Sequence, residues 1–216
     1  MRAILLPAVI ARTWYGDVPV EKSAAYRKLL RDVGLADYSR VLGNKGGYVL
    51  ERTDGGITRF MLVSFWDSLE SIKGYAGDNI EAPAYTSFDP QYLLSLEPTV
   101  QHHTVYARCL DMRDGVLARL WHGAVPLSKS QIYLDLMQNV GLYGYERTPG
   151  NLSAYLLFRT TGDAAHFTTL TFWESRSAIE AFAGADIERA RYYDFDPHYL
   201  IEMEPTVVHY DVYASL

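Results

Sequence analysis

The pattern of apolar and polar residues at the start of the chain predicts a strand followed by a helix. Val9 to Trp14 is rich in apolar and β-branched residues, as half-buried strands are. From Pro19 to Val33 the apolar residues recur at helical spacing, with proline in the first turn and Gly34 directly after the last turn. We therefore expect this helix to end at Gly34. Its apolar stripe consists of Ala25, Leu29, Leu30 and Val33.

The next stretch predicts a hairpin, because two strand-like runs flank a glycine turn. The runs are Tyr48 to Arg52 and Ile57 to Trp66, and Asp54-Gly55-Gly56 lies between them. A last strand is expected over Val100 to Ala107, after a short turn at Asp89-Pro90.

A second helix is expected between the hairpin and the last strand. Asp67 stands three residues before Glu70, which is the spacing of a capping box. Gly77 marks the expected end of this helix. The order strand, helix, strand, strand, helix, strand is that of a ferredoxin-like unit, and the fold class is therefore α+β.

The whole pattern occurs a second time in the chain. Residues 11–107 align without a gap with residues 118–214, and about 45 of the 97 aligned pairs are identical. Both copies begin with the motif WxGxVPxxK and close with EPTVxH. We therefore expect two tandem ferredoxin-like (βαββαβ) domains, at residues 1–109 and 116–216, joined by a polar linker at 110–115.

The predicted sheets need a partner, because a ferredoxin-like sheet carries its helices on one face and leaves the other face uncovered. We expect the two sheets to pack against each other as a pseudo-dimeric α/β barrel around a ligand pocket. Strand alternation places Arg12 on the same face as Trp14, and Arg119 on the same face as Trp121. We expect these faces to point into the space between the sheets and the more apolar faces to meet the helices.

Composition narrows the range of partners. The 216 residues are 49% hydrophobic and carry a formal charge of −6, without the basic stripe that nucleic acids require. The single cysteine excludes an internal disulfide, and no Cys/His cluster has zinc-site spacing. The apolar stretch from Ile4 to Ala11 lacks a cleavage signature and is expected to be a strand, and no apolar run approaches the roughly 20 residues of a membrane span. We expect a cytoplasmic protein without nucleic-acid or membrane partners.

The motifs WxGxVPxxK, FWxS followed by AG, and EPTVxH make the sequence similar to the antibiotic biosynthesis monooxygenase-like families of the dimeric α/β barrel superfamily. The resemblance covers almost the whole chain, twice. Members of that superfamily are usually single domains that form the barrel as homodimers. The resemblance therefore implies a fused dimer, a monomeric pseudo-dimer that can dimerise further. It also implies a small-molecule pocket without fixing the reaction, since the superfamily includes oxygenases of polyketide anthrones and quinols, heme-degrading enzymes and isomerase-like proteins.

Aromatic and polar residues that recur in both copies are the candidate site residues. Such a set suits a flat, hydrophobic, partly hydroxylated ligand. Core packing is the competing interpretation for the tryptophans and a structural role for the histidines. The catalytic candidates are His209, Arg119 and Trp173, and the substrate-binding candidates are Trp121, His122, Tyr192, Trp14, Arg12, Trp66, Tyr85 and His102.

One chemistry that these residues support is oxygenation without metal, flavin or other cofactor. A base removes a proton from an anthrone or hydroquinone, and the resulting anion reacts directly with dioxygen. His209 is the expected base, while Arg119 and the indole N–H of Trp121 or Trp173 stabilise the developing oxyanion. The expected partners are an aromatic polyketide-type substrate and dioxygen.

Three alternatives stay open. In the heme-degrading branch a tryptophan ends the third strand, as Trp66 and Trp173 do, and Tyr85 and Tyr192 occupy the place expected for the heme-ligating histidine. Tyrosine can ligate heme iron, so heme is the alternative cofactor. A non-oxidative cyclase or isomerase, or a non-catalytic binding protein, would use the same pocket.

The two copies are not expected to be equal. The second copy keeps the more family-like stretch from Glu188 to Tyr193, whereas Pro83 lacks a backbone donor and disfavours helix at Ala82. We therefore expect the first pocket to be reshaped and the second repeat to carry the better pocket.

Overall fold

The computed structural model describes residues 9–109 and 115–216. The expected linker at 110–115 lies outside the described residues except for Gly115, and so does the part of the expected N-terminal strand before Val9. Contacts divide the chain into two units. Among the described residues, the first-repeat unit contains 9–103 together with 211–216, and the second-repeat unit contains 104–109 together with 115–210. Within the described ranges, no helix is both long and apolar enough to cross a membrane.

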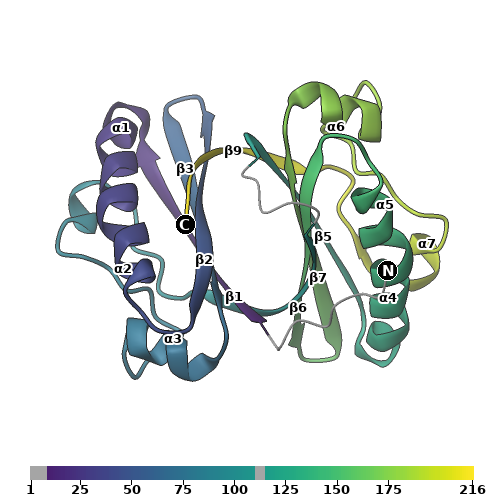
Figure 1. Cartoon of the computed structure of the whole chain (residues 1–216), viewed down its shortest axis with the longest axis horizontal. Helices are drawn as coiled ribbons and strands as arrows, with labels where there is room; N and C mark the ends of the chain where they lie inside the picture. Colours follow the sequence, from purple (N-terminus) through teal and green to yellow (C-terminus); the bar gives the residue numbers. More distant parts are fainter. Residues whose placement is uncertain (1–8, 110–114) are drawn as a thin grey trace. The chain divides into compact units, whose positions relative to one another are not determined.

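The first repeat has the expected order of strands and helices. Its antiparallel sheet has the strand order β4, β1, β3, β2, β9, and Figure 1 shows α1 and α2 along one face of it. The elements are β1 (Val9–Pro19), α1 (Val20–Leu29), a π-helical segment η1 (Leu30–Leu35), α2 (Ala36–Ser39), β2 (Asn44–Asp54), β3 (Ile57–Trp66), α3 (Leu69–Ala76), a 3-10 turn η2 (Asp89–Gln91) and β4 (Gln101–Cys109).

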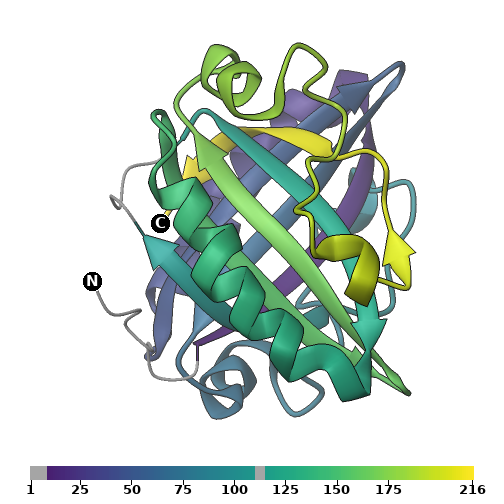
Figure 2. The same cartoon turned by 90° about the vertical axis from the view of Figure 1, so that its right-hand side faces the viewer.

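The second repeat has the same order. In its sheet β7 lies between β6 and β5, β4 pairs with the other edge of β6, and β9 and β8 pair with β5. Figure 2 shows the helical stretch of this repeat, residues 127–146, in front of its strands. The elements are β5 (Leu117–Pro126), η3 (Leu127–Lys129), α4 (Ser130–Leu136), a π-helical segment η4 (Met137–Leu142), α5 (Tyr143–Glu146), β6 (Asn151–Thr161), β7 (Ala164–Trp173), α6 (Arg176–Ala183), α7 (Asp196–Tyr199), β8 (Glu202–Met203) and β9 (Val208–Ser215).

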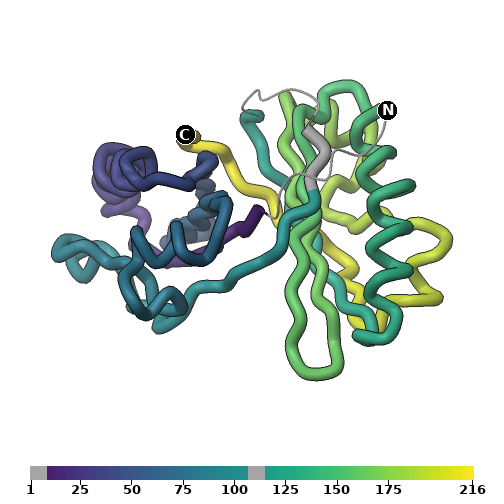
Figure 3. Tube along the Cα trace, turned by 60° about the horizontal axis from the view of Figure 1, so that its bottom comes forward, coloured from purple at the N-terminus to yellow at the C-terminus, as the bar shows by residue number. Residues whose placement is uncertain are grey.

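The last strand of each repeat ends in the other unit's sheet. In the second-repeat unit, Thr104 to Cys109 of β4 pair with β6, and Figure 3 shows this teal segment beside the green β6–β7 hairpin. In the first-repeat unit, Asp211 to Ser215 of β9 pair with Tyr48 to Glu51 of β2. Each exchanged segment covers a sheet edge whose backbone groups would otherwise be unpaired. The units therefore divide inside β4 and β9, whereas the sequence suggested a boundary after residue 109.

The first helix does not end at Gly34. The π-helical segment carries the chain through this residue into α2, and Gly34 is not among the glycines with positive φ that end helices. The second repeat has a π-helical segment at the same place. Leu30 of the expected stripe is buried, but Tyr26 is buried as well and Ala25 is exposed.

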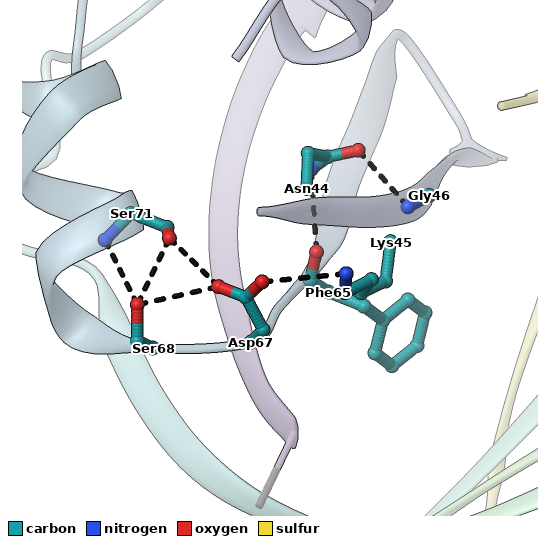
Figure 4. Close-up of polar contacts among 7 residues, drawn as sticks. All are labelled: Asn44, Lys45, Gly46, Phe65, Asp67, Ser68 and Ser71. Carbon is teal, nitrogen blue, oxygen red and sulfur yellow. Dashed lines mark hydrogen bonds and ion pairs between the residues drawn. The ribbon is translucent and has the colours of Figure 1, made fainter. Parts of the chain in front are cut away.

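The cap of α3 lies one residue later than the capping box suggested. Ser68 is the N-cap, and its hydroxyl accepts a 3.1 Å hydrogen bond from the backbone N–H of Ser71. Asp67 instead accepts from the Ser71 hydroxyl at 2.7 Å and pairs with Lys45 at 3.3 Å (Figure 4). The helix ends at Gly77 as expected, at a φ of 81° that favours glycine.

The strand faces are the reverse of the expected assignment. Trp14 packs in one core with Tyr26 and Leu30 of the helical stretch at residues 20–39, so the Arg12–Trp14 face of β1 meets the helices. In the second repeat, Arg119 and Trp121 of β5 lie against the corresponding helical stretch. Alternation fixes which residues share a face but not which face the helices cover. The packing of the two sheets as a barrel stays a prediction.

Candidate functional site

Each repeat has a cavity between its sheet and its helical stretch. The cavity of the first repeat has a volume of about 280 Å³, near the lower end of small-molecule sites. It is formed by β1, the helical stretch, α3 and the loop before η2. Its aromatic and charged lining residues are Arg12, Trp14, Tyr26, Asp37, Tyr38, Tyr75, Tyr85 and Asp89.

The matching cavity of the second repeat is nearly closed. Its volume is about 20 Å³, room for about one water molecule. Arg119 and Trp121 line it at the positions of Arg12 and Trp14. The expectation that the second repeat carries the better pocket is therefore wrong in its geometry.

Pro83 removes a backbone hydrogen bond from the segment that borders the first cavity. In the second repeat the backbone N–H of Ala190 donates to the Pro205 carbonyl at 2.9 Å, and the N–H of Val207 donates to the Glu188 carbonyl. Pro83 occupies the position of Ala190 and has no N–H to donate. The first repeat therefore lacks one of these two bonds, and it has the larger cavity.

Arg12 is a buried cation held by neutral groups. Its side chain is 4% exposed, and its terminal nitrogens donate to the carbonyls of Ile80 and, at 2.7 Å, Ala82. Its Nη1 also lies 3.3 Å from Nε2 of His102, whose Nδ1 lies 3.3 Å from Glu81. These contacts fit a neutral imidazole that donates from Nδ1 and accepts at Nε2. Burial lowers the pKa of Arg12 and also that of His102.

The phenols beside Arg12 are neutral. Burial raises the pKa of Tyr38 and that of Tyr75, and their rings lie 4.8 Å apart. Both groups therefore keep their protons at neutral pH. The cavity thus combines the positive charge of Arg12 and two carboxylates, Asp37 and Asp89, with neutral hydrogen-bond donors and aromatic walls.

Trp14 and Tyr85 form a short relay at the loop side of the cavity. The indole N–H of Trp14 donates to the Tyr85 hydroxyl at 3.1 Å, and this hydroxyl donates to the Glu97 carbonyl at 3.0 Å. In the second repeat Trp121 and Tyr192 both donate to the Glu204 carbonyl instead, at 2.9 and 2.6 Å.

Two carboxylates border the first cavity. Asp89 accepts three hydrogen bonds, from the Tyr26 hydroxyl and from the backbone N–H and hydroxyl of Thr86. Asp37 is 46% exposed at its side chain and accepts a 3.1 Å bond from Arg40. Protein donors occupy the Asp89 carboxylate, so Asp37 is the carboxylate that is more open to a ligand.

The structure brings together only part of the candidate set. Arg12, Trp14 and Tyr85 line the first cavity, and Arg119 and Trp121 line the second. The other candidates lie outside both linings: Trp66, His102, His122, Trp173, Tyr192 and His209.

The tryptophans that end β3 and β7 are core residues. Trp66 and Trp173 are completely buried, and their indole N–H groups donate at 2.9 Å to Ser64 and Thr171. This placement supports the core-packing interpretation over a contact with substrate.

The histidine candidates lie behind or opposite the cavities. His209 repeats the position of His102, with Nδ1 3.2 Å from Glu188, and its Nε2 has no hydrogen-bond partner in the described part of the chain. His122 follows Trp121 and so lies on the opposite sheet face, where Nδ1 is 2.8 Å from the Thr168 hydroxyl.

Sequence reasoning missed the polar residues that the helical stretch and the loop bring to the cavity. Tyr26 and Asp89 recur as Tyr133 and Asp196, and Tyr38 recurs as Tyr145. A polar residue that recurs on the inner face of an amphipathic helix was the available signal. Asp37 and Tyr75 carried no such signal, since Gly144 and Phe182 replace them.

Heme does not fit this site. The Tyr85 hydroxyl already accepts from Trp14 and donates to Glu97, and a porphyrin is larger than most ligands of cavities of about 300 Å³. Among the described residues, no group of three or more His, Cys, Asp or Glu side chains is placed to hold a metal ion. Independence from cofactors stays a prediction.

Solved structures share the fold over nearly the full chain. A candidate monooxygenase from Fusobacterium nucleatum subsp. nucleatum superposes with a TM-score of 0.69 at 11% identity, covering 98% of this chain and 95% of that one. An anthrone oxidase-like protein superposes with a TM-score of 0.66 at 16% identity, covering 100% and 95%. A ferredoxin-fold protein from Listeria monocytogenes, described as related to antibiotic biosynthesis monooxygenases, gives 0.50 at 11% identity and covers 98% of both chains.

The chain has the fold of the antibiotic biosynthesis monooxygenase-like proteins. The resemblance seen in the motifs is thus confirmed at the level of the fold. No family model matches the sequence, and no curated protein does. At these low sequence identities the neighbours show the fold of the chain. The reaction has to be argued from the residues of the site.

Proposed function

We propose that the first-repeat cavity binds a hydroxylated aromatic molecule of the anthrone or hydroquinone type and that the protein oxidises it with dioxygen, without metal or flavin. The observation that carries this proposal is a buried Arg12 beside neutral phenols in an aromatic cavity. The monooxygenase-like neighbours, one of them anthrone oxidase-like, support the reaction type.

Arg12 and the phenols favour the anion of such a substrate. Removing a proton from an anthrone or hydroquinone leaves negative charge on an oxygen attached to the ring. A preorganised guanidinium and neutral O–H donors stabilise that charge in a site with little water. Arg12 therefore lowers the substrate's pKa, and the phenols of Tyr38 and Tyr75 line the same cavity.

Asp37 is the proposed proton acceptor. It lies at the cavity with an exposed carboxylate, whereas His102 lies behind Arg12 with Nε2 already accepting. This assignment replaces His209 as the expected base and moves the chemistry to the first repeat.

The overall reaction balances without a further reductant. For an anthrone, the ring carbon that loses its proton gives up electrons to dioxygen and forms a hydroperoxide. Loss of water from this group breaks the O–O bond. One oxygen atom becomes the new carbonyl, the other leaves as water with the two hydrogens of the former CH₂ group, and the product is a quinone.

The test is oxygen uptake with 1,8-dihydroxyanthrone in the presence of a chelator, followed together with quinone absorbance. We expect Arg12→Met to lower the rate about 10²-fold, as loss of an oxyanion donor does, and Asp37→Asn to lower it by a similar factor. Arg119→Met is the matched control, because it makes the same change at the nearly closed cavity, and we expect it to leave the rate unchanged.

Oxygen uptake no faster than in buffer would overturn the proposal, as would equal losses from Arg12→Met and Arg119→Met. Conversion of the anthrone to a product other than the quinone without dioxygen would identify a non-oxidative reaction such as isomerisation. Metal analysis and a visible spectrum of the active protein test its independence from cofactors.

A further inference from the structure

The second cavity is filled by two of its own side chains. Arg191 and Tyr193 line it at the positions where the first repeat has Ala84 and Thr86. The volume difference between the cavities, about 280 against about 20 Å³, therefore coincides with two small-to-large replacements on one loop.

The Tyr193 side chain makes contacts of the kind that an aromatic ligand would make. Its hydroxyl donates to the carbonyl of Gly141 at 3.2 Å, and its ring stacks on Phe195 with the planes 4° apart. A Cβ at Gly144 would lie 3.1 Å from the hydroxyl, so a side chain at that position would crowd the phenol. The first repeat has Asp37 there.

Arg191 lines the same cavity, and the residue is exposed. Its guanidinium lies 4.7 Å from the centre of the Phe182 ring and donates to the Phe182 carbonyl at 2.7 Å. Phe182 corresponds to Tyr75 in the first repeat. The two side chains thus place a phenol and a flat polar group in one cavity.

The first repeat cannot fill its cavity in this way. Ala84 ends at its Cβ, and the hydroxyl of Thr86 is turned to Asp89 at 2.8 Å. The carbonyl of Gly34, equivalent to that of Gly141, belongs to a residue lining the first cavity.

We propose that Tyr193 and Arg191 mark the position of the ligand. A hydroxylated aromatic ring takes the place of Tyr193 in the first cavity, with its hydroxyl on the Gly34 carbonyl and its remaining rings over Tyr75. The chain then binds one ligand, in the first repeat, and the second repeat is closed by its own side chains. This inference rests on the proposed function only in placing the ligand in the first cavity.

Calorimetric titration with 1,8-dihydroxyanthraquinone, which is not oxidised further, measures the number of sites. We expect one site per chain in the unchanged protein and two in Arg191→Ala/Tyr193→Thr. The reciprocal variant Ala84→Arg/Thr86→Tyr/Asp37→Gly closes the first cavity and should bind none. Anthraquinone without hydroxyls should bind about five- to tenfold more weakly, because it lacks one hydrogen bond.

Two sites in the unchanged protein, no binding at all, or a single site in the folded opened variant would overturn the inference. Near-ultraviolet circular dichroism checks folding, and Tyr193→Thr alone is the second variant if the double one does not fold. The expected site counts without oxygen uptake would reject the proposed reaction but keep the ligand position. Oxygen uptake together with two binding sites in the unchanged protein would support the proposed reaction but reject the ligand position.

Discussion

The hydroxyl of Tyr26 donates a 2.7 Å hydrogen bond to the buried carboxylate of Asp89. The same carboxylate accepts the backbone N–H of Thr86, so one residue ties the helical stretch to the loop that closes the cavity. Tyr133 and Asp196 repeat the contact at 2.9 Å in the second repeat. Burial, followed by the bond to Asp89, raises the pKa of Tyr26 and keeps it a donor.

Tyr26→Phe should therefore destabilise the fold and weaken ligand binding. It leaves one buried oxygen of Asp89 without its donor, which costs about 1–3 kcal/mol in the free energy of unfolding. Urea unfolding followed by fluorescence measures the first effect, and titration with 1,8-dihydroxyanthraquinone measures the second.

Tyr133→Phe is the control for this variant. It removes the same bond beside the nearly closed cavity, so it should lower stability by a similar amount and leave ligand affinity unchanged. Equal losses of affinity in both variants would show that the Tyr26 bond does not shape a ligand site.

Trp66→Phe and Trp173→Phe should lower stability without changing ligand affinity. Both indoles are completely buried, and each donates to a hydroxyl two residues earlier in its strand. Loss of buried ring atoms and of this bond costs about 1–3 kcal/mol in the free energy of unfolding. A fall in turnover beyond that of other equally destabilised variants would instead restore Trp173 as a catalytic candidate.

The repeat made most of the fold predictable. Two copies of the hairpin around Gly55 and Gly162, with the same helices before and after it, fixed the order of elements in each half. Local sequence rules failed where contacts with neighbouring residues decide the structure. Asp67 and Glu70 matched a cap, but Ser68 reaches the free N–H of Ser71.

The site was less predictable, because it depends on which face the helices cover. Alternation correctly joined Arg12 with Trp14, and it cannot say that this face meets the helical stretch. The volume of the cavity depends on side chains of another segment, Ala84 and Thr86, whose positions relative to β1 only the folded chain defines.

Stability should fall below about pH 6.5 because of three partly buried histidines. Burial lowers the pKa of His102, His122 and His209 below the ordinary value near 6.5. The unfolded chain then binds more protons than the folded one between the lowered and the ordinary pKa values, so stability decreases as pH falls through that window. Unfolding free energies measured between pH 5 and 8 should show this slope.

His102→Gln combined with His209→Gln should flatten the slope. The double variant removes two of the three groups while keeping polar side chains beside Glu81 and Glu188. An unchanged slope would mean that these imidazoles do not lose their protons on folding. A slope of opposite sign would mean that the acidic neighbours outweigh burial.

Truncation after Tyr210 tests the exchange of strand ends. Residues 211–216 pair with β2 in the first-repeat unit, and the N–H of Leu216 donates to the Gly47 carbonyl at 2.9 Å. Their loss leaves the β2 edge open, so hydrogen exchange of amides in 44–54 should accelerate about tenfold or more. The strand β6 keeps its partners β4 and β7, so its amides serve as the internal control. Faster exchange in β6, with β2 unchanged, would place the end of β9 in the second-repeat unit and contradict the pairing.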